Sequence, residues 1–144
     1  MDGIDKLFSG MRAASSGMSA ERVRIDTVAT NIANANTTRT PDGGPYRRQL
    51  VHFAPLLARA ANGSNEVVGV RVGKITPDMT TPLPRILDPS HADCDAEGYV
   101  TYPNINPVME MADLISATRA YEANVAAQEQ FVAMAERALR LVQS

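Results

Sequence analysis

The residues best suited to chemistry gather in one short stretch near the middle of the chain. This stretch contains the potential metal ligands and nucleophile His91, Asp93, Cys94, Asp95 and Glu97. A tetrahedral metal site needs a second Cys/His pair, which the sequence does not supply, and His52 lies far away along the chain. We expect a solvated acidic loop with no metal and no cofactor, and we keep a metal-dependent hydrolase as a competing hypothesis.

Two other motifs could bind an anionic group. Gly43 and Gly44 could approach a phosphate, but they stand between two prolines with no GxxxxGK motif and no helix start after them, so we interpret them as a turn. Arg47 and Arg48 follow each other on a predicted strand, where neighbouring side chains point to opposite faces. This pattern is typical of a solvated surface pair.

Composition limits what the rest of the chain can be. Its 144 residues suffice for one compact unit with extended arms, and the apolar residues, 44% of the total, concentrate toward the two ends. The net charge is −2, from 14 basic and 16 acidic residues that are interspersed, which argues against nucleic-acid binding. The single cysteine excludes an internal disulfide. We therefore expect no nucleic-acid binding, and a chain of this length has no room for a second, enzymatic domain.

The N-terminal residues show no targeting or membrane signal. Two acids and one base interrupt the first eight positions, and no segment reaches the roughly 18 consecutive apolar residues of a membrane span. We expect no direct membrane insertion. The protein either stays in the cytoplasm or leaves it by a route that needs no cleaved signal peptide.

Residues 2 to about 35 predict a long helix that packs along another helix. Apolar side chains recur every seven residues, at Ile4, Met11, Met18, Ile25 and Ile32. The companion series, three residues on, is Leu7, Ala14, Glu21, Val28 and Ala35. This is the a/d pattern of a coiled coil. Because glycines 10 and 17 each weaken a helix by about 1 kcal/mol relative to alanine, we expect a partner to order it.

Residues 107 to 142 predict a second helix of the same kind. Pro107 suits the first position of a helix, and no proline or glycine follows it up to Val142. One seam consists of Met111, Thr118, Val125, Val132 and Leu139, with Leu114, Tyr121, Gln128, Ala135 and Val142 beside it. A second apolar edge consists of Phe131, Met134, Ala138 and Leu141. The helix thus has more apolar surface than one partner helix would cover.

Residues 37–106 predict a small, irregular β insert, because they hold most of the prolines and turn residues. The candidate strands are 46–53, 66–75 and 98–102, and residues 76–90 are expected to form an extended connection. The fold class is α+β. Two long terminal helices, residues 1–36 and 107–144, form a coiled-coil-like pair with the insert between them.

The segment Asn31 to Thr38 predicts the end of the first helix. Asn and Thr side chains compete with helical hydrogen bonds, and Asn tolerates the left-handed conformation at a helix C-terminus. On its own, this segment is simply a cap followed by a loop.

The same segment resembles a known family signature. It is similar to the Asn-rich motif of flagellar rod, hook and hook-associated axial proteins, through Asn31, Asn34, Asn36 and Thr37. The block after it resembles the version in proximal-rod members, through Gly43, Gly44, Pro45, Tyr46 and Arg47. Residues 88–93 and 97–106 are similar to that family's approach to its C-terminal helix. Residues 110–124 resemble its helix-opening motif, ending in Tyr121, Glu122 and Asn124.

This resemblance implies a structural subunit of the proximal rod of the bacterial flagellar basal body, a motility organelle. Such a subunit is exported unfolded through the flagellar type III apparatus without a cleaved signal. It then stacks with copies of itself, with other rod proteins, and with membrane-ring and rod-adaptor proteins at the rod base. The product is a hollow helical tube that crosses the periplasm, transmits torque and conducts later subunits.

We therefore hypothesise that the seam of the first helix packs against Met111, Val125, Val132 and Leu139, within and between subunits. The insert would face outward, and Tyr121, Glu122 and Asn124 would lie near the Asn-rich loop. Besides the hydrolase, two rivals stay open. One is another axial protein, such as a distal-rod or hook subunit, and the other is a soluble coiled-coil adaptor that forms a closed oligomer.

Overall fold

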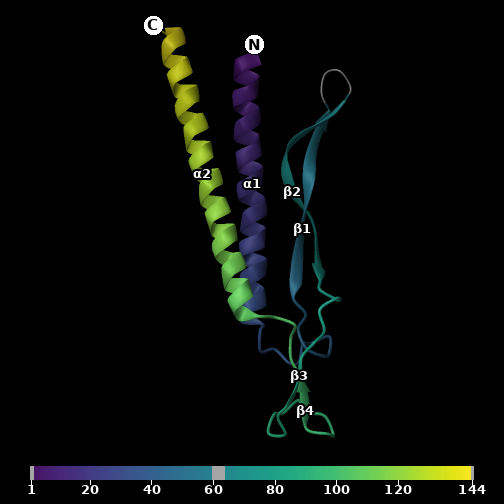
Figure 1. Cartoon of the computed structure of the whole chain (residues 1–144). Coiled ribbons are helices and arrows are strands. Elements are labelled where there is room, and N and C mark those ends of the chain that lie inside the picture. Colours follow the sequence, from purple (N-terminus) through teal and green to yellow (C-terminus); the bar gives the residue numbers. More distant parts are fainter. Residues whose placement is uncertain (1, 60–63, 144) are drawn as a thin grey trace.

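Two long helices form an antiparallel pair. The computed structural model describes the backbone of residues 2–59 and 64–143 and the side chains of residues 8–59 and 64–141. Helix α1 spans Asp2–Ala33 and helix α2 spans Pro107–Gln143. They lie side by side, so both ends of the described chain are found at the same end of the molecule (Figure 1). The α+β fold class and both predicted helices are confirmed.

Local side chains explain where the helices begin and end. The Asn106 side-chain oxygen accepts the backbone N–H of Val108 at 3.0 Å, so Asn106 caps α2 just before Pro107. At the end of α1, the Asn34 amide donates to the Thr30 carbonyl at 2.9 Å, and the chain tightens into successive turns. Helix α1 ends at Ala33, where the Asn-rich segment predicts its end, and it does so without a left-handed residue, since within the described ranges only Gly43, Gly44 and Gly98 have positive φ.

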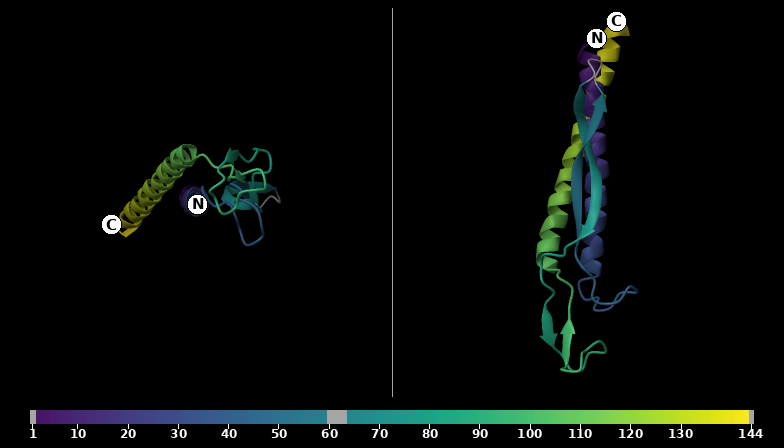
Figure 2. Two further views of the ribbon diagram at one scale, coloured as in Figure 1. Left: turned by 90° about the horizontal axis from the view of Figure 1, so that it is seen from below. Right: turned by 90° about the vertical axis from the view of Figure 1, so that its right-hand side faces the viewer.

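A β-hairpin runs along α1 on the side away from α2 (Figures 1 and 2). Strands β1, Gln49–Arg59, and β2, Asn65–Pro77, pair antiparallel. The predicted first strand, 46–53, is wrong at both ends. Residues 46–48 precede the sheet, and the strand continues through Pro55, because every strand of a two-stranded sheet is an edge strand and can tolerate proline.

A second, smaller sheet lies at the opposite end from the termini (Figure 2). It consists of β3, Arg85–Leu87, and β4, Tyr99–Thr101. The sequence predicts β4 but treats β3 as part of an extended connection. Three residues between prolines carry too little pattern to reveal a strand whose partner lies more than ten positions away.

The buried apolar core is small. Its side chains are those of Ala14, Ala20, Val28, Val100 and Ala117, none larger than valine. Most large apolar side chains in the described chain are partly or mostly exposed instead. Helix α1 lies between α2 and the hairpin, so α1 is covered on two sides whereas the other two elements are covered on one.

Candidate assembly interface

Buried polar groups meet where four elements converge at the base of the helices. We call this cluster the polar junction, and its members are Asn31, Tyr46, Arg48, Asp78, Asn104 and Glu110. The end of α1, the start of β1, the end of β2 and the start of α2 all contribute to it. The cluster therefore decides how the two helices and the hairpin lie relative to one another.

Asn31 is the centre of the polar junction and is only 1% exposed. Its amide nitrogen donates to the Gln49 carbonyl and to the Glu110 carboxylate, each at 3.0 Å. Its oxygen accepts the Gln49 N–H at 2.9 Å and the Tyr46 hydroxyl at 3.2 Å. One α1 side chain is thereby tied to both the hairpin and α2, which satisfies nearly all of its hydrogen-bonding capacity.

Glu110 places a carboxylate in the interior with 1% exposure. The Arg48 Nε donates to one of its oxygens at 2.5 Å, and Asn31 donates to the other. Arg48 also reaches Asp113 at 3.0 Å, so one guanidinium bridges two acids of α2. A buried carboxylate without such a partner would be strongly destabilising, so Arg48 and Glu110 have to be considered together.

Burial and charge also act on Tyr46. Desolvation, followed by the nearby Glu110 carboxylate, raises the pKa of the Tyr46 phenol above its ordinary value. The Tyr46 phenol therefore stays protonated, and can donate to Asn31, up to a pH above the ordinary tyrosine pKa.

Asp78 and Asn104 hold the chain that leaves β2. Hydroxyl and backbone donors of Thr81 and then Thr80 surround the Asp78 carboxylate and lower its pKa strongly. The Asn104 amide donates to the Asp78 carbonyl at 3.1 Å and its oxygen accepts the Arg48 N–H at 2.9 Å. The segment leading into α2 is thus fixed to both strands of the hairpin.

The predicted solvated pair of arginines is wrong. Arg48 binds the two acids of α2, and the Arg47 guanidinium donates to the Asp78 carbonyl at 3.1 Å. Both lie just before β1 rather than in it, so strand alternation does not separate them. The sequence contained one sign of this contact. Glu110 stands in an otherwise apolar helix start, where a buried carboxylate needs a cationic partner.

Above the polar junction, glycine lets the helices approach closely. A Cβ added at Gly10 would lie 2.5 Å from the Phe131 ring, and one at Gly17 would lie 2.8 Å from the Asn124 amide. On α1, contacts with α2 involve Gly10, Gly17, Arg24 and Asn31, and Ala14 and Val28 of the predicted companion series are buried. The predicted row at 11, 18, 25 and 32 lies next to these residues and is half-buried, and its part in assembly stays a prediction.

The other predicted assembly residues are only partly used inside the chain. Met11, Met18, Ile25 and Ile32 of α1 are half-buried, as are Leu114, Tyr121 and Val125 of α2. Met111, Val132 and Leu139 are 51%, 40% and 62% exposed. The side chains of Ile4, Leu7 and Val142 lie outside the described residues. The apolar surface of the pair thus exceeds what the two helices cover for each other.

The family-motif residues are divided between two places. The base of the helices contains Asn31, Tyr46 and Arg47. There the Thr37 hydroxyl also donates to the Asn34 side chain. Asn36 and the turn with Gly43, Gly44 and Pro45 follow on the surface. Asn124 packs on Gly17, far along α2 from Glu110, the residue that meets Asn31. The expectation that Tyr121, Glu122 and Asn124 lie near the Asn-rich loop is therefore wrong.

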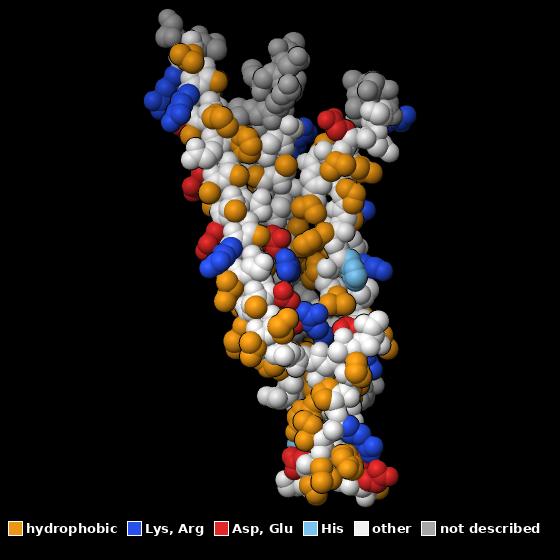
Figure 3. All heavy atoms as spheres, viewed as in Figure 1, with side chains coloured by type: hydrophobic (Ala, Val, Ile, Leu, Met, Phe, Trp, Pro, Cys, Tyr) orange, Lys and Arg blue, Asp and Glu red, His pale blue; other side chains and the backbone are white. Residues whose placement is uncertain are grey.

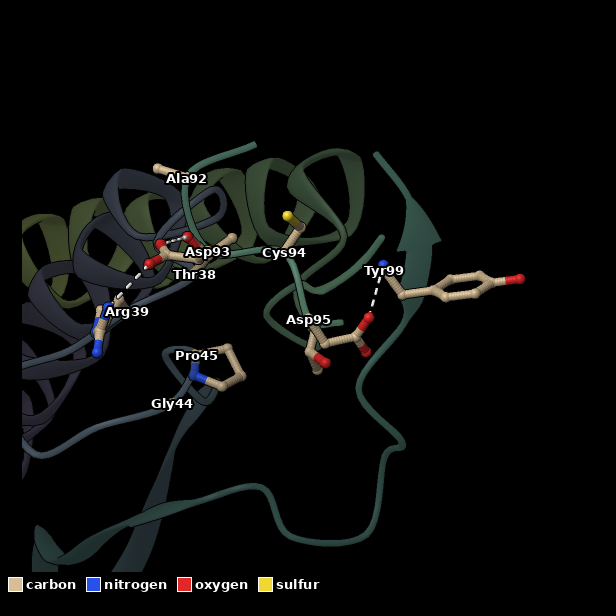
Figure 4. A pocket seen from close by; sticks show the side chains of 10 residues that line it. Thr38, Arg39, Gly44, Pro45, Ala92, Asp93, Cys94, Asp95 and Tyr99 are labelled. Carbon is tan, nitrogen blue, oxygen red and sulfur yellow. Dashed lines mark hydrogen bonds and ion pairs between the residues drawn. The ribbon is translucent and has the colours of Figure 1, made fainter. Parts of the chain in front are cut away.

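The loop from His91 to Glu97 lines a cavity of about 370 Å³ with residues of the Thr38–Pro45 turn (Figure 4). Asp93 accepts hydrogen bonds from Thr38 at 2.8 Å and from Arg39 at 3.3 Å. Arg85, followed by the Tyr99 backbone N–H, lowers the pKa of Asp95. These acids are thus occupied by neighbouring side chains and backbone, and they join the small sheet to the loop after α1.

The described residues form neither a metal cluster nor a membrane-spanning helix. In the described ranges no three or more His, Cys, Asp or Glu side chains come together in a way that could hold a metal ion. Neither α1 nor α2, as far as they are described, has a stretch long and apolar enough to cross a lipid bilayer.

Comparison with known proteins matches both ends of the chain. Residues 11–39 match the family model "Flagella basal body rod protein", and residues 96–141 match "Flagellar basal body rod FlgEFG protein C-terminal". The flagellar basal-body rod protein FlgC of Borreliella burgdorferi is 45% identical, over 95% of this chain and 98% of its own. FlgC of Bacillus subtilis is 40% identical, over 93% and 97% respectively. FlgC of Salmonella typhimurium is 37% identical over 78% of this chain.

Proposed function

This chain belongs to the FlgC family of flagellar basal-body rod proteins and is a structural subunit of the rod, and we propose that it polymerises through α1 and α2. The product is a hollow helical tube in the proximal rod that serves as drive shaft and export channel. A different axial role, as another rod or hook-type subunit, is the alternative.

The observation that supports this mechanism best is the apolar surface that α2 leaves open. Met111, Val132 and Leu139 are each at least 40% exposed in the single chain, although they lie on a helix already paired with α1. Exposed apolar side chains that recur at one heptad position of a helix are typical of a contact with further helices. Neighbouring subunits that supply further helices would cover it.

We assign the tube wall to the terminal segments. Residues 1–36 and 107–144 form the rod core, and residues 37–106 form the insert. The proposed interface consists of Ile4, Leu7, Met11, Met18, Ile25, Val28, Ile32, Met111, Leu114, Tyr121, Val125, Val132 and Leu139. Within this set Val28 is buried in its own chain, so it contributes by stabilising the subunit itself.

A subunit of the proximal rod would contact several kinds of flagellar protein. Other flagellar rod proteins and further copies of this chain are the lateral and axial neighbours, and membrane-ring and rod-adaptor proteins meet it at the rod base. The chain reaches the flagellar basal body through the type III export apparatus, without a cleaved signal, and spans the periplasm there. It has no enzymatic activity and needs no cofactor, nucleic acid or membrane insertion.

Deletion of the gene, followed by electron microscopy of isolated basal bodies, tests the structural role. We expect rings without a rod, no motility, and recovery when the gene is supplied on a plasmid. Intact rods in the deletion strain would overturn the assignment.

A single substitution tests the interface. Val125→Asp should prevent incorporation into basal bodies while the protein is still expressed, because a carboxylate would be buried among apolar side chains of the neighbouring subunit. Ala123→Asp, at an exposed position two residues away on α2, is the control and should incorporate normally. Circular dichroism of both purified chains checks that α2 still folds. Normal rods with Val125→Asp would contradict this mechanism.

A further inference from the structure

Helix α1 has one side that neither α2 nor the hairpin covers. Its exposed residues there are spaced alternately three and four positions apart, which places them on one line along the helix. We call this line the α1 outer stripe, and its members are Arg12, Ser15, Ser19, Arg22, Asp26 and Ala29. Half of these side chains are small, so another helix can approach the stripe closely.

Helix α2 has a matching line on the side away from α1. Its spacing also alternates between four and three, and every member is exposed, whereas Ala117 on the opposite side of the helix is completely buried. We call this line the α2 outer stripe, and its members are Ile115, Arg119, Glu122, Ala126 and Glu129. Figure 3 shows acidic and basic side chains along the edge of α2 that faces away from α1.

The charges of the two stripes are complementary and unused. Within the described part of the chain, no ion pair involves Arg12, Arg22, Asp26, Arg119, Glu122 or Glu129. In chain order, the α1 outer stripe carries two positive charges and then a negative one. In reverse chain order, the α2 outer stripe carries two negative charges and then a positive one. Opposite signs in opposite order suit two antiparallel helices that pair with each other.

These stripes cannot meet within one chain, because both lie on outer sides of the helix pair. We propose that the α1 outer stripe of one copy packs antiparallel against the α2 outer stripe of a second copy of this chain. A second copy is the occupant because one chain carries both complementary stripes. This inference rests on the proposed function, and it names the faces through which neighbouring rod subunits meet.

Contacts inside the chain show which positions of α1 and α2 lie at the same height. A Cβ at Gly17 would meet the Asn124 side chain, and one at Gly10 would meet the Phe131 ring. A step of seven residues along α1 therefore corresponds to a step of seven along α2 in the opposite direction. A neighbouring copy that points the same way and lies at the same height would repeat this correspondence.

A neighbour at the same height gives a poor match between the stripes. Arg22 would then face Arg119, so two like charges would lie opposite each other. Asp26 would face Ile115 and have no cation. A neighbour displaced along the helices by three to four residues, about 5 Å, removes both conflicts. The facing residues are then Ser15 with Glu129, Ser19 with Ala126, Arg22 with Glu122, Asp26 with Arg119, and Ala29 with Ile115.

This displacement decides the kind of assembly. The α1 and α2 outer stripes are different surfaces, so the contact is heterologous and continues from subunit to subunit. Because each neighbour is shifted along the helix axis, the series of contacts rises instead of closing into a flat ring. The product is a helical array, as a rod requires.

Disulfide cross-linking in isolated basal bodies tests the contact and the displacement together. In a Cys94→Ser background, a tagged chain with Ala126→Cys is expressed in the deletion strain with a second chain that carries Ser19→Cys. Oxidation should join the two chains, because these positions face each other in the displaced contact. The matched control carries Ser15→Cys in place of Ser19→Cys. Position 15 would face position 126 only in a level contact, so we expect about tenfold less joined product.

A charge exchange tests the contact independently of cysteine. Arg22→Glu alone and Glu122→Arg alone should each lower incorporation into basal bodies about fivefold, since like charges would then face each other. A chain with both substitutions restores opposite charges in every contact and should incorporate nearly as well as the wild type. Arg71→Glu, the same charge change at an exposed hairpin position, is the matched control and should incorporate normally. Immunoblots measure each amount, and circular dichroism of the purified chains checks their helices.

The outcomes separate this inference from the proposed function. Wild-type incorporation without joining of positions 19 and 126, or a double variant no better than either single variant, would overturn the stripe contact and leave the rod assignment standing. Stronger joining through position 15 would overturn the displaced arrangement. Joining of the tagged chain to a different basal-body protein would overturn the second copy as the occupant. Absence of the wild-type chain from basal bodies would overturn the rod assignment and this inference together.

Discussion

The polar junction and the outer halves of the helices are stabilised in different ways. At the junction, Asn31, Arg48 and Glu110 bond to one another and to the backbone, so the charge and amide that are buried there have partners within the chain. Farther along the pair, Gly10 and Gly17 of α1 meet Phe131 and Asn124 of α2, while Val132 and Leu139 remain exposed. The junction therefore fixes the shape of one subunit, and the outer halves present the surfaces that other subunits can cover.

The largest expected effect is at Arg48. Arg48→Ala would leave the Glu110 carboxylate buried without its cation, and we expect a loss of about 3 kcal/mol in the free energy of unfolding. Urea unfolding of the purified chain, followed by circular dichroism, measures this loss. Adding Glu110→Gln should recover part of it, because a neutral amide replaces the unpaired charge.

Leu139→Ser is the matched variant in the outer half. Leu139 is 62% exposed, so we expect a change below about 0.5 kcal/mol in the same measurement, together with weaker incorporation into basal bodies. Equal losses of stability for Arg48→Ala and Leu139→Ser would contradict the inferred difference between the polar junction and the outer halves of the helices.

A smaller effect is expected where the helices touch. Gly17→Ala places a methyl group against the Asn124 amide, and we expect a net loss of about 1 kcal/mol, since the overlap outweighs the gain in helix propensity. The control is Ser19→Ala, at an exposed position on the same helix, which should be neutral or slightly stabilising. Stabilisation by Gly17→Ala would show that the helices can separate there without cost.

The smallest effect depends on pH. The raised pKa of Tyr46 means that the folded chain holds this proton more tightly than the unfolded chain. The resulting stability is present below the ordinary tyrosine pKa of about 10 and is lost as pH rises through the folded pKa. Tyr46→Phe also loses the hydrogen bond to Asn31, which costs about 1 kcal/mol at pH 8. The stability gap between wild type and variant should narrow from pH 8 to 11, and a constant gap would contradict the shift.

The helices were predictable because their signals are local. Pro107 marks the start of α2, and the Asn-rich segment marks the end of α1 to within a few residues. The contacts of Gly10, Gly17 and Arg24 with α2 were not predicted, because these residues do not look like an apolar seam. Glycine has no side chain and therefore lets α1 and α2 approach closely. A pattern of hydrophobic residues does not reveal such a position.

The polar junction could not be derived from local patterns. Asn31 and Glu110 are 79 positions apart, and Arg48 and Glu110 are 62 apart, so no spacing rule connects them. Asn31 was singled out, but as a cap and a motif residue and not as a buried hub. One face of the hairpin is apolar, and it was hidden for another reason, because two bulges change the alternation on β2 and only the pairing with β1 restores it.

The common position of both chain ends has a consequence for the order of folding. The contact between Gly10 and Phe131 joins the first turns of α1 to the last third of α2, so it closes a loop that includes most of the chain. Closing so long a loop is entropically costly and slow compared with forming local structure. In a chain that emerges gradually from a narrow passage, α1 thus cannot pair with α2 until nearly all of the chain has passed. The hairpin, whose strands are close in sequence, can form first and then serve as the surface along which α1 is ordered.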